Sequence, residues 1–393
     1  MENYYLKNKL YMEHISNRII IWGANLQYTY GLMRAFGECG IKVTVLLDPC
    51  DKKFCYLRFS KYIEKIHYLN TVDDGLKILY NEYWNEKEKP IILCSSDVSI
   101  CMLDANYNTL KDHFYIFNSN NEQGRISYLM DKTVTFPIAE KCGFNVIKTW
   151  EVSDPNEVPD DITFPCITKG RNSSTSTKKA IHVCYNRKEL LNSLESGIDY
   201  LVQEYIEKDY ELCLVGFSYN HGENVINYGV VKKIRDGLQR QSTYIRIDDI
   251  KKYPLNLKES VKSFLAEIKY DGLFGIDLIQ KNGKYYFLEI NLRNDGTTFL
   301  STSAGANYPM CWAKYCIGSL TQDYINSIQF HTPHFLMQMD DLYNIFDGKV
   351  KICNWIKEAL STQAHYVMNK KDYKPFLYQC YMRSKQLIKK ILY

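Results

Sequence analysis

Near its N-terminus the chain carries a strand–helix–strand pattern, which restricts the fold more than any other segment does. Residues 18–22 are a short β-branched and aromatic run, residues 28–39 have helical periodicity, and residues 41–47 are a second apolar run. Two strands joined by one helix pair in parallel, because the helix returns the chain to the edge where it started. With a third strand at 90–94, residues 1–124 predict a small doubly wound, Rossmann-like α/β domain.

The middle of the chain has a different pattern. Apolar runs of strand length recur from residue 164 onward, and the last two, at 273–280 and 284–291, are separated by Lys281-Asn282-Gly283. Asn-Gly between two such runs is typical of a β-hairpin. We therefore expect an α+β region of antiparallel strands over residues 125–320 and a helical C-terminal extension over 321–393.

The composition is that of an ordinary globular protein, and it excludes several classes of function. The 393 residues are 46% hydrophobic and 24% charged, and 49 Lys and Arg against 45 Asp and Glu leave a net charge of +4. So small an excess argues against a dedicated nucleic-acid-binding protein. We find no run of about 18 apolar residues, as a membrane span needs, and no secretory pattern at the N-terminus. The 13 scattered Cys indicate reduced thiols, so we expect a soluble, cytoplasmic protein.

The turn after the first strand argues against a dinucleotide-dependent oxidoreductase. A dinucleotide-binding turn reads Gly-x-Gly-x-x-Gly, whereas residues 23–28 contain one glycine, Gly23. Without the other glycines the backbone cannot approach a pyrophosphate as closely. The helix N-terminus near Asn25 could hold a carboxylate, and an ordinary tight turn explains the sequence at least as well.

Polar side chains interrupt the apolar strands of the predicted hairpin. Asp277 lies in the first strand, and Glu289 and Asn291 lie two apart in the second. Alternation places Glu289 and Asn291 on one face, with the neighbouring apolar residues on the other, and pairing across the hairpin brings Asp277 alongside. Carboxylate and amide oxygens are the ligands that Mg²⁺ prefers. Arg293, further along the same face, is a fixed cation that can bind a phosphoryl oxygen.

Two lysines upstream suit the same chemistry. Lys132 begins a predicted helix, and Lys169 ends a predicted strand. A lysine is a point charge suited to phosphate oxygens, although either residue alone would be read as a surface lysine. Their order ahead of the acidic hairpin gives them their significance.

Taken together, these segments resemble the ATP-grasp superfamily over nearly the whole chain. The resemblance is carried by Met130-Asp131-Lys132 with the helix after it, the strand that ends at Lys169, Val202-Gln203-Glu204-Tyr205-Ile206, and Phe287-Leu288-Glu289-Ile290-Asn291-Leu292-Arg293. Within the superfamily, the segments 173–183 and 291–307 and the C-terminal tail are most similar to D-aspartate ligase and related carboxylate–amine ligases.

The resemblance implies ATP and Mg²⁺ as cofactors, with two ions expected and Mn²⁺ as an alternative metal. It implies catalytic roles for Lys169 and Arg293, and metal binding by Asp277, Glu289 and Asn291. It also implies that nucleotide is bound by Lys132, Lys169, Lys178, Gln203, Glu204, Tyr205, Ile206 and Glu211.

The activity implied by the resemblance is the joining of a carboxylate to an amine. ATP phosphorylates the carboxylate, the amine attacks the acyl phosphate, and ADP and phosphate are released. The partners expected are an amino acid and a small acceptor that bears a carboxylate or an amine; the acceptor's identity and a homodimer both stay open.

Several features leave alternatives. The polar loop at 171–177 follows Gly170 and contains no glycine, which is the best support for a non-catalytic nucleotide-binding or scaffold protein with a degenerate fold. The basic segment 232–240 is equally well an anion-binding site or a solvated hairpin tip. The C-terminal segment 374–393 has five basic residues and no acid, so it could lie on an anionic membrane, but packing against its own domain is favoured.

Overall fold

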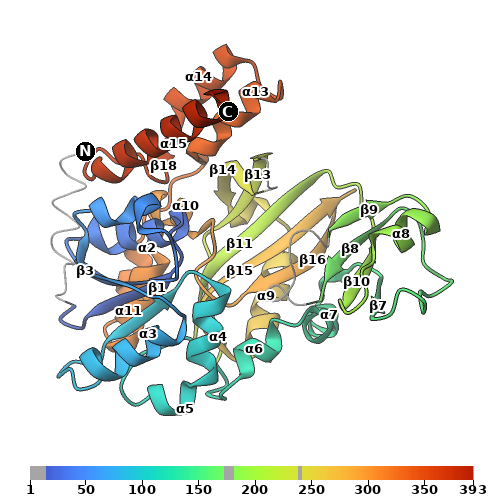
Figure 1. The fold of residues 1–393 in the computed structure, drawn as a ribbon. Helices are drawn as coiled ribbons and strands as arrows, with labels where there is room; N and C mark the ends of the chain where they lie inside the picture. The colour runs from blue at the N-terminus through green and yellow to red at the C-terminus, as the bar shows by residue number, and fades with distance from the viewer. Residues whose placement is uncertain (1–14, 172–180, 238–240, 393) are drawn as a thin grey trace.

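A computed structural model describes residues 15–171, 181–237 and 241–392 (Figure 1). Figure 1 shows four parts: an N-terminal α/β lobe, a large central sheet, a small sheet at one end of it, and a group of C-terminal helices on top. Among the described residues, no helix combines the length and the apolar character that crossing a bilayer requires.

The N-terminal lobe is a four-stranded parallel sheet in the order β3-β2-β1-β4. Strands β1, β2 and β4 are buried along their whole length, as their β-branched sequences predict. The strands are β1 (Ile19–Gly23), β2 (Val43–Leu47), β3 (Ile63–Tyr68) and β4 (Ile91–Cys94), and the helices are α2 (Gln27–Gly37), α3 (Asp73–Ile78), α4 (Asp97–Ala105) and α5 (Tyr107–Leu110). The predicted doubly wound domain is therefore present, with β3 as an additional edge strand.

The small sheet is antiparallel, in the order β7-β10-β8-β9. It has its own hydrophobic core, which includes Trp150, Leu190 and Val202, separate from the main core of the molecule. Its elements are β7 (Thr149–Val152), β8 (Cys166–Gly170), β9 (His182–Cys184), α8 (Arg187–Ser193) and β10 (Tyr200–Glu204).

The large sheet has the order β18-β17-β14-β13-β11-β15-β16-β6, with β12 pairing to β11 and β5 to β15. It is mainly antiparallel, but β6 and β18 pair in parallel at its two edges. The apolar run at residues 225–232 does not form one strand, because its first residues end β12 and its last residues begin β13. The strands are β5 (Asn118–Ser119), β6 (Asn145–Val146), β11 (Tyr210–Tyr219), β12 (Asn224–Ile226), β13 (Gly229–Asp236), β14 (Ser242–Asp249), β15 (Tyr270–Lys281), β16 (Lys284–Asn291), β17 (His334–Met337) and β18 (Ala364–His365).

Helices cover this sheet and join it to the other parts. Phe287 of β16 packs against Phe136, Phe144 and Phe264, and so fixes α7 and α9 on the sheet. The helices are α6 (Arg125–Leu129), α7 (Lys132–Lys141), α9 (Leu255–Glu267), α10 (Thr298–Ser303), α11 (Tyr308–Cys316), α12 (Gln322–Ser327), α13 (Tyr343–Phe346), α14 (Ile352–Ser361) and α15 (Lys374–Leu392).

The C-terminal extension was predicted to be helical. It contains helices, but it also adds two strands, β17 and β18, to the large sheet. The first half of α15 packs on the N-terminal lobe, where the ring of Tyr378 contacts Phe59 and its hydroxyl donates to the carbonyl of Lys53. This contact agrees with the favoured interpretation that the C-terminal helix packs against the protein. The domain boundaries at 124 and 320 stay predictions.

Candidate functional site

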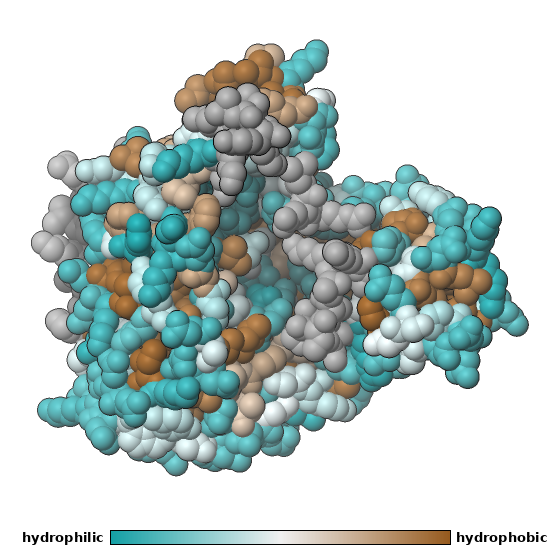
Figure 2. All heavy atoms as spheres, viewed as in Figure 1, coloured by the Kyte–Doolittle hydropathy of each residue, from teal (hydrophilic) through white to brown (hydrophobic). Residues whose placement is uncertain are grey.

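A cavity of about 580 Å³ lies where the parts of the molecule meet. Figure 2 shows a polar recess at this position, between the N-terminal lobe and the small sheet. Tyr28 of α2 lines it from the N-terminal lobe, Lys169 from the small sheet, and Gln338 and Tyr366 from the C-terminal extension. The predicted residues that line it are Lys132, Lys169, Glu211, Asp277, Glu289, Asn291 and Arg293.

The hairpin β15–β16 places its two acids directly opposite each other. Asp277 pairs with Glu289, whereas the next residue, Leu278, pairs with Phe287, so Leu288 is the extra residue of a β-bulge. Regular strand alternation predicts that Leu288 faces away from Glu289, but Leu288 lines the same cavity. The bulge is the reason, since one inserted residue interrupts the alternation of faces.

Burial and neighbouring acids shift the ionisation of Asp277. Burial, reinforced by the negative charges of Asp295 and Glu289, raises the pKa of Asp277 to about 8. Asp277 thus lies among further carboxylates, and carboxylate oxygens are the donors that Mg²⁺ prefers. The residues therefore fit a hard divalent cation bound at Asp277 and Glu289.

Lys132 and Lys169 both lie near Glu289. The Lys132 ammonium is 3.1 Å from Oε2 of Glu289, and its side chain is only 9% exposed. Burial would raise the pKa of Glu289, but the positive charges of Lys132, Lys169 and Arg293 outweigh it and lower the pKa. Burial lowers the pKa of Lys169. The negative charge of Glu289 raises this pKa and the positive charge of Lys132 lowers it, and the net shift is downward.

Lys132 is positioned by the start of α7. Asp131 caps this helix by accepting from the backbone N–H of Thr133, at 2.9 Å. Arg171, at the end of β8, forms an ion pair with Asp131 at 3.0 Å. The cap and the ion pair thereby tie the helix that bears Lys132 to the strand that bears Lys169.

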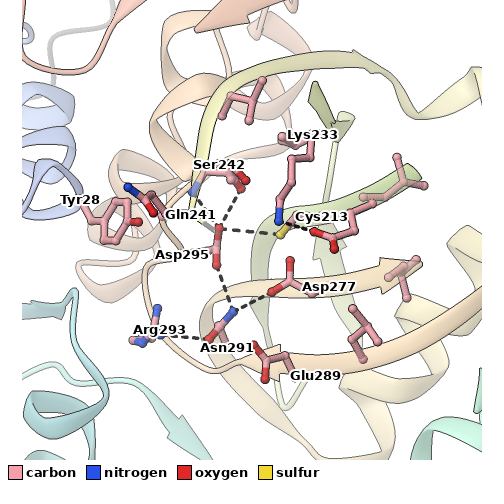
Figure 3. A pocket seen from close by; sticks show the side chains of 18 of the residues that line it. Tyr28, Cys213, Lys233, Gln241, Ser242, Asp277, Glu289, Asn291, Arg293 and Asp295 are labelled. Atoms are coloured by element: carbon pink, nitrogen blue, oxygen red, sulfur yellow. Dashed lines mark hydrogen bonds and ion pairs between the residues drawn. The ribbon is translucent and has the colours of Figure 1, made fainter. Parts of the chain in front are cut away.

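Asn291 connects the acids to Arg293. Its Nδ2 donates to Oδ2 of Asp295 at 3.1 Å and, less closely, to Asp277 at 3.4 Å, and its Oδ1 accepts from Nη2 of Arg293 at 3.0 Å (Figure 3). A cation between the carboxylates would require the amide to turn its oxygen toward them. Metal binding by Asn291 therefore stays a prediction.

Arg293 is held by the N-terminal lobe. Its Nε lies 2.5 Å from Oδ1 of Asp97, in the first turn of α4, and its Nη1 donates to the carbonyl of Asn294. Burial would lower the pKa of Arg293, but Asp97 and Asp295 raise it, so the guanidinium is a permanent cation.

Glu211, predicted to bind the nucleotide, forms ion pairs with Lys208 and Lys233. Burial opposes ionisation, but the two lysine charges outweigh it and lower the pKa of Glu211. Lys233 belongs to the basic segment 232–240, and it lines the cavity as the anion-binding interpretation expects. Arg235 of the same segment instead pairs with Asp341, and residues 238–240 lie outside the described residues.

The remaining predicted nucleotide ligands are placed differently. Gln203, Glu204, Tyr205 and Ile206 do not line the cavity as far as the described chain defines it. Gln203 is buried and donates to the hydroxyl of Thr149 at 2.9 Å, while Glu204 is exposed. Lys178 and residues 172–177 of the glycine-free loop lie outside the described residues.

Sequence reasoning missed Asp295. Its Oδ1 accepts from the backbone N–H and the hydroxyl of Thr297, at 2.7 and 2.8 Å, and its carboxylate is near Asp277 and Cys213. A Cβ at position 275 would lie 2.6 Å from that of Asp295, so glycine at 275 leaves room for this side chain. Asn294-Asp295-Gly296, directly after the acidic strand, was the available signal, and it reads as an ordinary turn.

Comparison with known proteins agrees with this fold. No protein-family profile matches the sequence. The D-alanine–D-alanine ligase of Fervidobacterium nodosum is 23% identical over 248 residues, covering 59% of this chain and 75% of that ligase.

Two solved structures illustrate the likeness in three dimensions. The L-amino acid ligase from Bacillus licheniformis is 14% identical with a TM-score of 0.61, and the match covers 79% of this chain and 77% of that one. The biotin carboxylase domain of the Hydrogenobacter thermophilus 2-oxoglutarate carboxylase, solved with MgADP, ADP and bicarbonate, is 15% identical with a TM-score of 0.61, and the match covers 80% and 73%. The chain therefore has the ATP-grasp fold, which confirms the predicted fold class.

Proposed function

We propose that the protein is an ATP-dependent carboxylate–amine ligase. The observation that carries the proposal is the convergence of Lys132, Lys169 and Arg293 on the cavity that also holds the opposed carboxylates Asp277 and Glu289. Three cations and a divalent-metal site within one cavity are what transfer of a phosphoryl group requires. A degenerate, non-catalytic fold has no need to keep this set complete.

In the first half-reaction, a carboxylate oxygen of the substrate attacks the γ-phosphorus of ATP, and the bond to the β,γ-bridging oxygen breaks. Lys132, Lys169 and Arg293 offset the negative charge on the phosphoryl oxygens. Mg²⁺ held by Asp277 and Glu289 would supply further positive charge to the triphosphate; two ions are expected, and Mn²⁺ has the same oxygen-ligand chemistry.

In the second half-reaction, the amine nitrogen attacks the acyl carbon, phosphate leaves with the bonding electron pair, and the nitrogen loses a proton. The cavity must exclude water, because water would hydrolyse the acyl phosphate. Tyr28, Gln338 and Tyr366 line the end of the cavity contributed by the N-terminal lobe and the C-terminal extension, and we assign that end to the acceptor.

We propose an amino acid as one substrate, because the matched ligases from Fervidobacterium nodosum and Bacillus licheniformis are named for amino acids. The cytoplasm, where ATP is abundant, is the proposed location. The acceptor and the oligomeric state are questions for experiment.

The proposal is tested by an ADP-release screen of amino acids paired with candidate acceptors, with products read by mass spectrometry. We expect Lys169→Ala and Glu289→Ala each to abolish amide formation without changing the far-ultraviolet circular dichroism. Near-normal ADP release by either variant with the true substrates would show that the site is wrongly assigned.

Thermal shift with MgATP separates the enzyme from a protein that binds no nucleotide. A ligand bound only by the folded state must raise the melting temperature. A shift without any ADP release across the screen would favour the non-catalytic binding protein.

A further inference from the structure

Helix α14 presents its apolar face to solvent. Ile352, Ile356 and Leu360, spaced by four residues, are 61%, 47% and 82% exposed, and every residue of the helix keeps some exposure. Side chains four apart lie on one face of a helix, so these three form a continuous stripe. Figure 2 shows apolar side chains gathered at the top of the molecule, where Figure 1 places α14.

The opposite edge of α14 attaches it to the protein. Trp355 donates its indole N–H to Asp341 at 2.9 Å, and Glu358 forms an ion pair with Arg235 at 2.7 Å. These polar contacts fix which face of the helix turns inward. The apolar stripe is therefore held outward by the fold, which is the reverse of the usual amphipathic helix on a protein surface.

Positive charge accompanies the stripe. Lys357 lies three residues before Leu360 and so borders the stripe, and Lys349 and Lys351 precede the helix; all three are exposed. Residues 342–393 contain ten Lys and Arg against three Asp and Glu, a net charge of +7. The first 341 residues contain 39 Lys and Arg against 42 Asp and Glu, a net charge of −3.

We propose that the α14 stripe, defined as Ile352, Ile356 and Leu360, binds an anionic lipid surface. An exposed aliphatic stripe bordered by lysines is the chemistry of a helix that lies in the membrane interface, where apolar side chains enter the acyl boundary and lysines meet headgroup phosphates. The separation of charge between the two parts of the chain orients the basic end toward such a surface. The proposal is independent of the proposed enzymatic function and concerns a segment other than α15.

The test is co-sedimentation of the full-length protein with large vesicles of phosphatidylcholine alone or mixed with phosphatidylglycerol. We expect binding to the anionic vesicles, weakening as salt is raised. Ile352→Ser, Ile356→Ser and Leu360→Ser combined should reduce the partition coefficient by about tenfold or more. Removing the charge of Lys351 or Lys357 with Gln should reduce it by about fivefold each and flatten the salt dependence.

Leu255→Ser is the matched control, because Leu255 is 69% exposed at the start of α9, on a different part of the surface. It should leave vesicle binding unchanged, and all variants should melt at the wild-type temperature, since the altered side chains are exposed. Vesicle binding that is absent in the wild type, or unaffected in the triple variant, would overturn the proposal. A dimer in solution that the triple variant abolishes, without vesicle binding, would assign the stripe to a second copy of the chain.

Discussion

The carboxylate of Asp97 lies 2.5 Å from Nε of Arg293, across 196 residues of sequence. Asp97 stands in the first turn of α4 in the N-terminal lobe, and Arg293 follows β16 of the large sheet. The carbonyl of Cys94, at the end of β4, also accepts from the backbone N–H of Asn294, so the two parts are joined by backbone as well as by charge. The N-terminal lobe thus sets the position of a cation in the candidate active site.

Asp97→Asn should lower kcat with little change in the KM for MgATP. The guanidinium would lose its charged partner, and a small displacement of a group that contacts the transition state costs about 100-fold in rate. Steady-state ADP release gives both constants. Asp97→Glu should recover part of the loss, because the charge is kept.

A double-mutant cycle distinguishes positioning from general destabilisation. Asp97→Ala combined with Arg293→Ala should be no slower than Arg293→Ala alone, because Asp97 acts through Arg293. Asp73→Asn is the control: Asp73 is an exposed acid in the first turn of α3, so it carries the same helix-dipole contribution without an active-site partner. Additive losses in the cycle would show that Asp97 does not act through Arg293.

Asp341 fixes the C-terminal extension to the large sheet. It is fully buried and accepts from Arg235 of β13, Thr243 of β14 and the Trp355 indole of α14. Asp341→Ala should lower the free energy of unfolding by about 3–5 kcal/mol, because it leaves buried donors and a guanidinium without their partner. Urea denaturation measures the change.

Asp160→Ala is the comparison for this substitution, since the Asp160 side chain is 99% exposed in its ion pair with Arg187. It should cost less than about 0.5 kcal/mol, as exposed ion pairs do. Equal effects of the two substitutions would mean that the Asp341 network contributes nothing beyond a surface pair.

The elements predicted well from sequence are those whose pattern is local. Strands β1, β2 and β4 are continuous apolar runs, and the Asn-Gly turn correctly predicts the hairpin that carries Asp277 and Glu289. Strand β3 was missed because Ile63–Tyr68 is an edge strand in which charged residues separate the apolar ones. Strands β17 and β18 were missed because they are too short to show periodicity and form only by pairing with distant strands.

The charged residues of the candidate site could be predicted from sequence, but the residues that hold them in position could not. Lys132, Lys169 and Glu289 each stand out as a charge that ends or interrupts an element, and the structure brings them together. Asp97 and Asp295 act through contacts whose partners are distant in sequence or set by a turn, and no local spacing encodes them. The bulge at Leu288 is likewise a property of strand pairing.

The half-buried imidazole of His334 should make the stability of the fold depend on pH in the mildly acidic range. Burial, together with the charge of His331, lowers the pKa of His334 to about 4, so the folded protein keeps it neutral. An unfolded histidine has a pKa near 6.5 and takes up a proton that the folded one does not. Its contribution to stability is therefore complete above about pH 6.5 and is lost as the pH falls toward 4.

His334→Gln tests this, and the quantity compared is the pH dependence of the melting transition rather than the stability at one pH. Between pH 7 and pH 4 the wild type should lose about 2 kcal/mol more than the variant, after allowance for partial solvent exposure of the ring. Parallel stability profiles for the two proteins would contradict the prediction.

Asp277→Asn should separate stability from activity. Burial, together with repulsion from Asp295 and Glu289, raises the pKa of Asp277, so the ligand-free protein must protonate this carboxyl at neutral pH, and a neutral amide of the same shape removes that cost. Without ligand, we expect the melting temperature to be unchanged or higher and the free energy of unfolding to increase by up to roughly 1 kcal/mol, as often happens when an active-site residue is neutralised. The same substitution should abolish the thermal shift produced by Mg²⁺ with ADP and reduce ADP release by about 100-fold or more. Because the two measurements are expected to move in opposite directions, a variant that is merely misfolded cannot produce the pattern, and a destabilised variant with normal turnover would remove Asp277 from the metal site.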